Sequence, residues 1–360
     1  MRVGSALRRV HVVIVLSLLA AACAGGVAIE AISSPAAAPG ADAPSTEAEV
    51  PSGDRDGLSL SPSSGNGDAS ALLDEPPARQ PRDVPMQLDA AAVITTSNVP
   101  VAVLMAVEEG LVVRTPCGRT AAVAHGGQLV GSVDVVLDPG HGGPIDRGAI
   151  GPTGLVEGDL NLELAFATQR LLEERGTTVL LTRTADYGTT LSVRAGLADA
   201  VGARALVSIH HNAPNANPSA VPGSEVFVQT GSAESRRLGG LIWESVVDTL
   251  GEFDGIEWTS AVDAGVLSVV NEEGSDVYGM IRRPETVAVL AELGYVSNPT
   301  EEALMQSPEY VGVAAAALAD AIEAYLDNPE AEGGGHVDQP RVFDPEAAPG
   351  TDECDDPPLR

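Results

Sequence analysis

The sequence predicts an α/β fold, a three-layer domain with a mostly parallel central sheet flanked by helices. From Val133 onward, short apolar runs alternate with longer segments that carry leucines at helical spacing. Strands that alternate with helices at these lengths are typical of a largely parallel sheet covered by helices. Both ends of the chain lack the pattern and are rich in Pro, Gly and acidic residues. We therefore expect the folded domain to span residues 131–327.

Strands and helices are expected in a regular order along this domain. The helix 159–175, for example, carries Leu160, Leu164, Leu171 and Leu172 at helical spacing and ends at Gly176. The expected strands are 133–137, 178–182, 205–209, 225–229 and 287–293. The expected helices are 159–175, 191–201, 232–250, 300–306 and 309–326.

The first 23 residues have the pattern of an export signal. Three arginines precede a short apolar run, 12–22, which gives the charged and apolar regions of a secretory signal peptide. The run is too short for a comfortable membrane span. It ends either in a small-residue cleavage site or in a lipoprotein signal that leads to acylation of Cys23, and Ala20 stands where lipoprotein signals usually carry Leu. We expect an exported protein in the cell envelope or outside the cell, with membrane tethering through Cys23 left open.

Three further segments flank the domain. Residues 24–87 are rich in Pro, Ala, Ser, Gly and Asp, so they predict a disordered linker that cannot bury enough apolar surface to fold. Residues 88–130 contain short β-like runs around a Thr-Pro-Cys-Gly turn signal, which fits either a small β module or a flexible lead-in with one hairpin. Residues 328–360 are expected to form a disordered acidic tail.

Charge and cysteine content narrow the class of protein. The formal net charge is −31, and every basic residue is an arginine. Such a chain lacks the Lys and Arg clusters that bind phosphates, so we expect no nucleic-acid partner. Export would allow Cys117 and Cys354 to form a disulfide, although two unrelated thiols are an equally simple interpretation.

Four polar residues stand where a site is expected. His141 follows the strand 133–137 on a glycine-rich turn, and His210 ends the strand 205–209. Glu292 lies inside an apolar strand, where a charge is costly to bury unless it is paired or bound. Glu157 precedes the first helix of the domain. Two His and one carboxylate that leave a coordination position open are a ligand set of catalytic zinc, whereas structural zinc usually has four protein ligands rich in Cys.

The order of these residues resembles the zinc-dependent N-acetylmuramoyl-L-alanine amidases of bacterial cell walls. The matching segments are LDPGHGG at 137–143, EGDLNL at 157–162, LTR at 181–183, SIHHN at 208–212 and ELGYVSN at 292–298. Five segments in order make the resemblance specific, where any one alone would be weak. It runs from about Val133 to Leu326.

The resemblance implies a site and a reaction. His141, Glu157 and His210 correspond to the zinc ligands of the family, and Glu292 to its catalytic glutamate. The substrate would be peptidoglycan, cut at the amide between the lactyl group of N-acetylmuramic acid and L-Ala of the stem peptide. Zn²⁺ would activate water and polarise the carbonyl, and Glu292 would act as general base.

Neighbouring residues have less specific expected roles. His211 should point away from His210 if both lie on a strand. Asn212 would orient a ligand or cap the turn, and Asp138 would hold His141 or form the turn before Pro. Glu225 resembles a glutamate common in the family, and Arg194 is expected to be structural.

Three alternatives to an active amidase remain. One is a catalytically silent, peptidoglycan-binding regulator of the same fold, which would be revealed by loss of a ligand or of the base. The second is a zinc peptidase of another family. The third is a structural α/β domain without a metal, which stoichiometric zinc in the purified protein would exclude. Some relatives carry an inserted inhibitory helix, and the short stretch 251–283 leaves no evident room for one.

Overall fold

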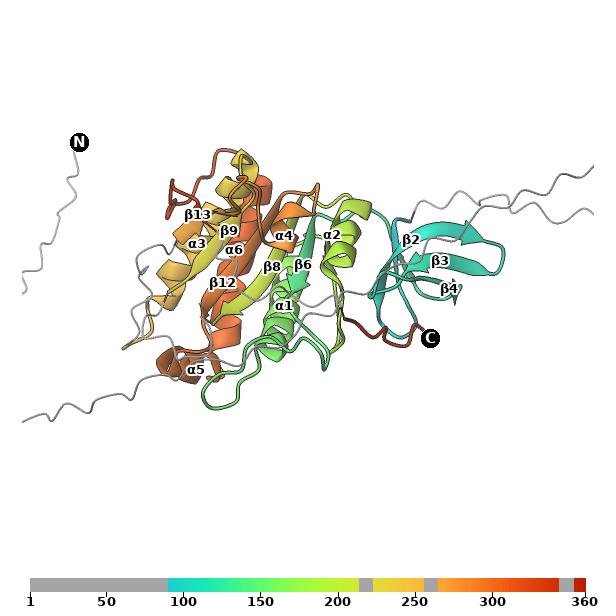
Figure 1. Cartoon of the computed structure of the whole chain (residues 1–360), viewed down its shortest axis with the longest axis horizontal. Helices are drawn as coiled ribbons and strands as arrows, with labels where there is room; N and C mark the ends of the chain where they lie inside the picture. The colour runs from blue at the N-terminus through green and yellow to red at the C-terminus, as the bar shows by residue number, and fades with distance from the viewer. Residues whose placement is uncertain (1–89, 214–222, 256–264, 343–352) are drawn as a thin grey trace, which may run out of the picture. The chain divides into compact units, whose positions relative to one another are not determined.

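The computed structural model describes residues 90–213, 223–255, 265–342 and 353–360, all within one compact unit, Pro76–Arg360 (Figure 1). The expected signal peptide, the linker and Cys23 lie outside the described residues. Among the described residues, no helix has the length and apolar character needed to cross a membrane.

A six-stranded sheet forms the middle layer of the domain. Its strands lie in the order β10-β9-β12-β8-β6-β7. They are β6 (Val135–Pro139), β7 (Val179–Leu181), β8 (Ala205–Asn212), β9 (Glu225–Val228), β10 (Gly265–Leu267) and β12 (Ala288–Tyr295). Four neighbours, β7, β6, β8 and β12, run parallel, while β9 is antiparallel to β12. The expected α/β fold with a mostly parallel sheet is confirmed.

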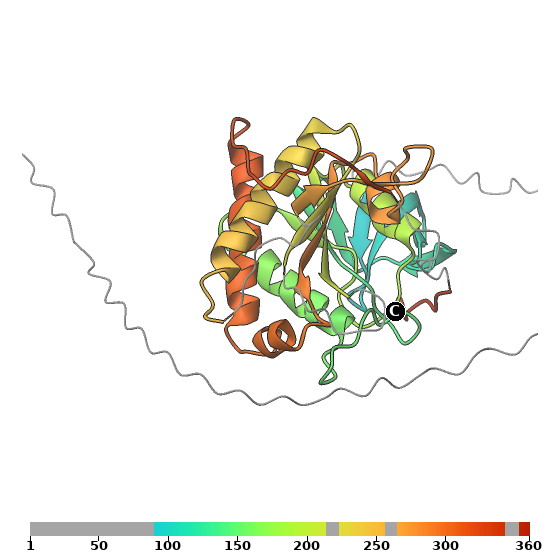
Figure 2. The same ribbon diagram turned by 60° about the vertical axis from the view of Figure 1, so that its left-hand side comes forward.

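Helices cover both faces of this sheet (Figure 2). The helices are α1 (Glu157–Glu174), α2 (Leu191–Ala200), α3 (Ala233–Leu250), α4 (Gly279–Arg282), α5 (Pro299–Met305) and α6 (Tyr310–Asp327). Two of their N-termini are capped by the residue types that the sequence supplies. Ser232 accepts a hydrogen bond from the Ser235 amide, and Asn298 accepts from the Thr300 and Glu301 amides. The five expected helices are all present, within two residues at each boundary.

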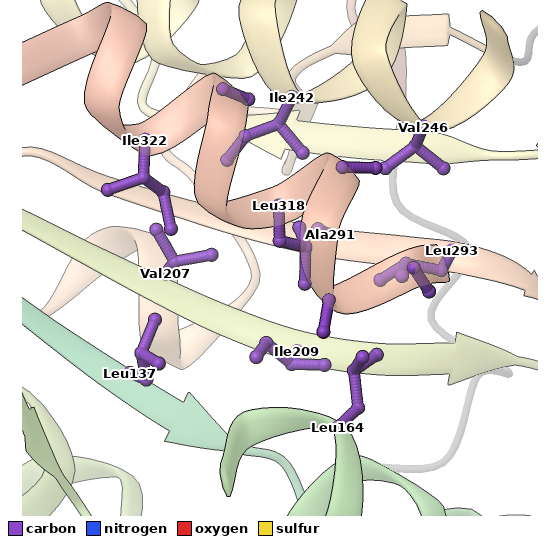
Figure 3. Packing of buried hydrophobic residues seen from close by; sticks show 14 of the residues in the cluster. Leu137, Leu164, Val207, Ile209, Ile242, Val246, Ala291, Leu293, Leu318 and Ile322 are labelled. Atoms are coloured by element: carbon purple, nitrogen blue, oxygen red, sulfur yellow. The ribbon is translucent and has the colours of Figure 1, made fainter. Parts of the chain in front are cut away.

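The larger core lies between the sheet and α1, α3 and α6. Alternate residues of β8, Val207 and Ile209, point into it, together with Leu318 of α6 (Figure 3). Because side chains alternate along a strand, Leu206, Ser208 and His210 belong to the other face, which packs on α2 and α4. That second face is apolar at Leu206 and becomes polar toward the carboxyl end of β8. The sheet therefore presents its polar residues at one edge.

Residues 90–130 form a separate five-stranded antiparallel sheet in the order β4-β3-β2-β1-β5. The strands are β1 (Ala92–Ile94), β2 (Pro100–Val107), β3 (Gly110–Arg114), β4 (Thr120–Ala124) and β5 (Gln128–Val130). Its own core is made of small aliphatic side chains such as Val93, Val101 and Val113. The Thr-Pro-Cys-Gly segment forms the turn between β3 and β4, and Cys117 on this turn is bonded to Cys354.

The C-terminal segment differs from the disordered tail expected after Asn328. Residues 329–342 and 353–360 lie against the rest of the unit, and β13 (Arg341–Val342) pairs with β11 (Val269–Val270). The expectation rested on the Gly, Glu, Asp and Pro content of the segment, and three of its glycines are packed closely against α3. A Cβ at Gly333 would lie 2.1 Å from the backbone of Gly240 in α3, and one at Gly335 would lie 2.2 Å from the Trp243 ring. Here glycine permits close packing rather than disorder.

Candidate active site

The polar residues of three neighbouring strands lie side by side at the expected edge. In the strand register, Glu292 of β12 is the partner of His210 on β8 and of Glu225 on β9. Partners in register project from the same face of a sheet. His141 follows the end of β6, the strand next to β8. The topology thus gathers His141, His210, Glu225 and Glu292 at one edge of the sheet.

Three of the four expected site residues converge on a common point. Glu157 Oε1 lies 3.2 Å from His141 Nε2 and 3.1 Å from His210 Nδ1. One ligand atom from each of the three residues lies within 4.8 Å of the others, and in the described part of the chain this is the group able to hold a metal ion. Two ligands about 2.0 Å from a tetrahedral zinc ion lie about 3.3 Å apart. The two spacings that involve Glu157 and the donor set therefore fit zinc.

His141 is held in place from both sides. It has φ of 60°, a left-handed conformation that is uncommon for a non-glycine residue and typical of functional sites. Its Nδ1 is 2.7 Å from Asp146 Oδ1, and its carbonyl oxygen accepts a hydrogen bond of 2.7 Å from Arg194. The Gly142 amide donates to the Asp146 carbonyl, which closes the turn that brings Asp146 back to the imidazole. Asp146 thus fixes the ring orientation of His141.

Asp146 and Glu157 also control the charge of His141. Burial lowers the pKa of the imidazole, but the hydrogen bonds and charges of these two carboxylates outweigh it and raise the pKa to about 10. In the absence of metal, His141 therefore carries a second proton at neutral pH. Metal binding releases that proton, because a ligand imidazole must be neutral.

Glu157 opens α1, where the positive end of the helix dipole favours a carboxylate. Only 4% of its surface is exposed. Its Oε2 accepts a hydrogen bond from the Ala149 amide at 2.8 Å, and its Oε1 accepts one from the His211 amide at 3.2 Å. Burial raises the pKa of this carboxyl, but the hydrogen bonds and charges of His141 and His210 hold the pKa well below its usual range. Glu157 is therefore ionised, as a metal ligand must be.

His211 points away from His210, as adjacent positions on a strand predict. It is fully buried, with Nδ1 2.7 Å from Asn161 Oδ1 and Nε2 2.8 Å from the Tyr310 hydroxyl. Burial lowers the pKa of this imidazole to about 3, so His211 is neutral. Asn161 in turn donates to Glu157 Oε1. His211 therefore supports Glu157 through its amide and through Asn161.

In the described part of the chain, Asp138 makes no hydrogen bond to His141, so the hypothesis that it holds His141 directly is wrong. Its buried carboxylate accepts hydrogen bonds from Ser208 and from Arg194, the latter at 2.7 Å. Since Arg194 also donates to the Pro139 and His141 carbonyl oxygens, the pair locks the turn that carries His141. Arg194 has the structural role expected from its position.

The LTR segment has a related role. Arg183 is 1% exposed and donates to the carbonyl oxygens of Gly140 and Gly158, at 3.0 and 2.6 Å. It joins the His141 turn to the start of α1.

Glu292 faces the site without a partner for one of its carboxylate oxygens. Within the described residues, Oε2 is buried and makes no hydrogen bond. Burial raises the pKa of Glu292 well above its usual range, the negative charges of Glu157 and Glu225 raise it further, and His141 opposes them. An ionisable oxygen left buried and unpaired is costly unless a ligand or metal-bound group completes it. The orphaned oxygen is therefore a second observation that fits an ion and its water at this place.

The roles of Asp146 and Asn161 were not predicted from the sequence. Asp146 stands five residues after His141 on the same glycine-rich turn, and an acidic residue on such a turn is the available signal. Asn161 is four residues after Glu157, so it lies one helical turn along the buried side of α1.

Comparison with known proteins identifies the family. A family model for N-acetylmuramoyl-L-alanine amidases matches residues 135–324, which carry all the residues of the site described above. This chain belongs to that family. Its members are hydrolases of the bacterial cell wall, and the resemblance drawn from the five sequence segments is confirmed.

Individual relatives are similar over the same domain. The chain is 33% identical over 216 residues to the uncharacterized protein YqiI of Bacillus subtilis, covering 59% of this chain and 95% of YqiI. It is 33% identical over 199 residues to the probable cell wall amidase LytH of Staphylococcus aureus, and it spans only 58% of LytH.

Solved structures of amidases are also similar. The N-acetylmuramoyl-L-alanine amidase AmiC2 of Nostoc punctiforme is 32% identical, with a TM-score of 0.45 over 55% of this chain and 98% of that one. An N-acetylmuramoyl-L-alanine amidase from Clostridium difficile 630 is 28% identical, with a TM-score of 0.47 over 55% of this chain and 98% of that one.

Proposed function

We propose that this protein is a zinc-dependent N-acetylmuramoyl-L-alanine amidase that acts on peptidoglycan. The bond cut is the amide between the lactyl group of N-acetylmuramic acid and L-Ala of the stem peptide. The observation that carries the proposal is the convergence of His141 Nε2, Glu157 Oε1 and His210 Nδ1 beside Glu292. Family membership supports the substrate class.

The metal centre would consist of His141, Glu157 and His210. With three protein ligands, a tetrahedral zinc ion keeps one position open for the reaction. When bound, the ion would polarise the amide carbonyl and make a water molecule easier to deprotonate.

Glu292 would move the proton. It sits next to His210 in the strand register, and one of its carboxylate oxygens is buried without a hydrogen bond among the described residues. As a carboxylate it would accept a proton from the attacking water and then deliver it to the leaving nitrogen of L-Ala. The positive charge of a metal ion beside Glu292 lowers the pKa that burial raises, so the base would be ionised when the site is loaded.

The cellular location follows from the same proposal. Peptidoglycan lies outside the cytoplasmic membrane, and the signal pattern of residues 1–23 would deliver the protein there. The described part of 251–283 contains β10, β11 and the four-residue helix α4, and residues 256–264 lie outside the described part. The absence of an inhibitory helix stays a prediction.

The test is an incubation of the zinc-loaded protein with purified peptidoglycan, followed by mass spectrometry of the released peptides. The wild type and a Glu285→Gln control, which removes an exposed carboxylate outside the site, should release stems that begin with L-Ala. Glu292→Gln should release at least about a hundredfold fewer, since it removes the general base. If the zinc-loaded wild type binds peptidoglycan and releases no stems, the silent regulator becomes the better interpretation.

A further inference from the structure

The C-terminal segment contributes to the catalytic edge of the sheet from outside the residues that match the family. The match ends at residue 324, whereas the segment 329–342 continues along the sheet. The Val266 amide donates to the Gly335 carbonyl at 2.7 Å, and the Val337 amide donates to the Val266 carbonyl at 2.9 Å. The segment therefore extends the sheet beyond β10, its last strand, and is bound by backbone hydrogen bonds.

The C-terminal segment places Arg341 beside Glu225, one of the residues that lie at the catalytic edge of the sheet. The Arg341 amide donates to the Ser268 carbonyl at 2.9 Å, which fixes the backbone of β13. The guanidinium nitrogen Nη2 of Arg341 donates to Glu225 Oε1 at 2.6 Å. Glu225 is 3% exposed and is the register partner of Glu292, the proposed base. A cation from a distant segment of the chain thus pairs with Glu225, the register partner of the proposed base.

The surroundings of Arg341 form a face that suits a peptide. Its guanidinium lies 5.9 Å from the centre of the Phe227 ring, and the Tyr278 ring lies 4.7 Å from the same ring. The Arg341 side chain is 35% exposed, and Tyr278 is 37% exposed. Asn212 donates to the other oxygen of Glu225, so the carboxylate that orients Arg341 is itself fixed.

The negative charge of the site bears on the role of Arg341. The site contains the carboxylates of Asp146, Glu157, Glu225 and Glu292, in a chain of formal charge −31. Arg183 and Arg194 are nearly fully buried against backbone oxygens and Asp138, whereas Arg147, which follows Asp146 on the turn after His141, is exposed. An anionic substrate entering this acidic site needs a cation that reaches the surface, and a planar guanidinium is suited to carboxylate recognition.

We propose that Arg341, with the aromatic face of Tyr278, binds a carboxylate of the substrate's peptide stem and so determines specificity beside Glu225. This inference rests on the proposed function, because peptidoglycan stems supply the free carboxylates. The C-terminal segment is then part of the substrate site rather than an appendage of the family domain.

The experiment compares two ligands and three variants of the zinc-loaded protein. The ligands are an N-acetylmuramoyl peptide with free carboxyl groups and the same peptide with those groups amidated. Arg341→Gln should raise KM for the free-carboxyl peptide about tenfold or more, with kcat within about twofold, and leave KM for the amidated peptide unchanged. Arg341→Lys should recover part of the loss, because it keeps the charge without the planar fork.

Arg236→Gln is the matched control. It removes an ion pair between α3 and Asp338 of the same C-terminal segment, 3.8 Å long and away from the strand ends. It should retain the wild-type preference for free carboxyls. A purely structural role for Arg341 predicts instead that Arg341→Gln affects both peptides equally, and that result overturns the proposal. If Arg341→Gln does not fold, Arg341→Lys decides: a preference for the free-carboxyl peptide equal to that of the wild type overturns the proposal.

Binding measured by calorimetry separates this inference from the proposed function. In a Glu292→Gln background, the free-carboxyl peptide should bind about tenfold more tightly than the amidated one, and this difference should vanish when Arg341→Gln is added. A wild type that cuts neither peptide contradicts the proposed function. The binding difference still decides the role of Arg341.

Discussion

Replacing Asp146 by Asn tests how the protein holds its first metal-ligating histidine. Asp146 Oδ1 lies 2.7 Å from His141 Nδ1, and the opposite ring nitrogen, Nε2, faces Glu157 at 3.2 Å. Asn can keep a hydrogen bond but loses the negative charge that makes the imidazole a stronger base. We expect weaker zinc binding with the fold intact.

The structure sets the size of this effect. Partners that orient a metal-ligating histidine typically contribute about 10–100-fold in metal affinity. The Asp146 side chain is 47% exposed, so solvent screens its charge. The expected loss for Asp146→Asn is therefore near the lower end of that range, about tenfold.

The assay is zinc competition against a chromophoric chelator at pH 7.5. Asp186→Asn is the matched control, since this substitution also removes one negative charge, from the neighbouring loop. Asp186 accepts its hydrogen bond from the Gly143 amide, at 2.6 Å, and not from His141. The control should bind zinc within about twofold of the wild type, because an Asn oxygen still accepts that bond. Equal zinc affinities for the two variants would refute the role assigned to Asp146.

Three other changes probe the packing and electrostatics of the domain. Gly140→Ala places a Cβ 2.2 Å from the His210 ring. It should lower zinc affinity at least about tenfold, measured by competition, and lower stability by about 1–3 kcal/mol, measured by urea unfolding. Gly196→Ala, whose Cβ would meet nothing within 4 Å, should change neither quantity. Burial raises the pKa of Glu301 to about 8, so its ionisation destabilises the fold as pH rises. Wild-type stability should therefore fall by about 3 kcal/mol more than that of Glu301→Gln between pH 5 and pH 8, and equal pH profiles would contradict this. Reducing the Cys117–Cys354 disulfide, which joins residues 237 positions apart, should cost about 2–4 kcal/mol in the same unfolding assay, and no change would mean that the bond constrains neither state.

Local patterns predicted the domain because its elements are locally specified. The helix 159–175 was expected from leucine spacing and observed as α1 (Glu157–Glu174). The strand 205–209 was expected from an apolar run and observed as β8 (Ala205–Asn212), extended through His210. In both cases the residues that bury the element lie within the element itself.

The gathering of His141, His210 and Glu292 was predictable for a topological reason. Parallel strands bring their carboxyl ends to one edge of a sheet, so residues at strand ends meet even when they are far apart in the chain. The antiparallel direction of β9 was not predictable from its own sequence. It places Glu225, the first residue of that strand, at the same edge.

Contacts between distant segments could not be predicted. Arg341 pairs with Glu225 across 116 positions, and no local pattern at either residue indicates the other. The three glycines before it lowered the expected order of the tail, because their close approach to Gly240 and Trp243 exists only in the folded state. Glycine composition alone does not separate a disordered segment from one packed tightly on a helix.

The most direct test of the central claim is a crystal structure of the zinc-loaded protein with anomalous data at the zinc absorption edge. We predict one strong peak within about 2.0–2.2 Å of His141 Nε2, Glu157 Oε1 and His210 Nδ1, on the side that Glu292 faces. A fully loaded crystal with its zinc peak elsewhere, or bound by fewer than two of these three residues, would contradict the proposed metal centre and the amidase mechanism built on it.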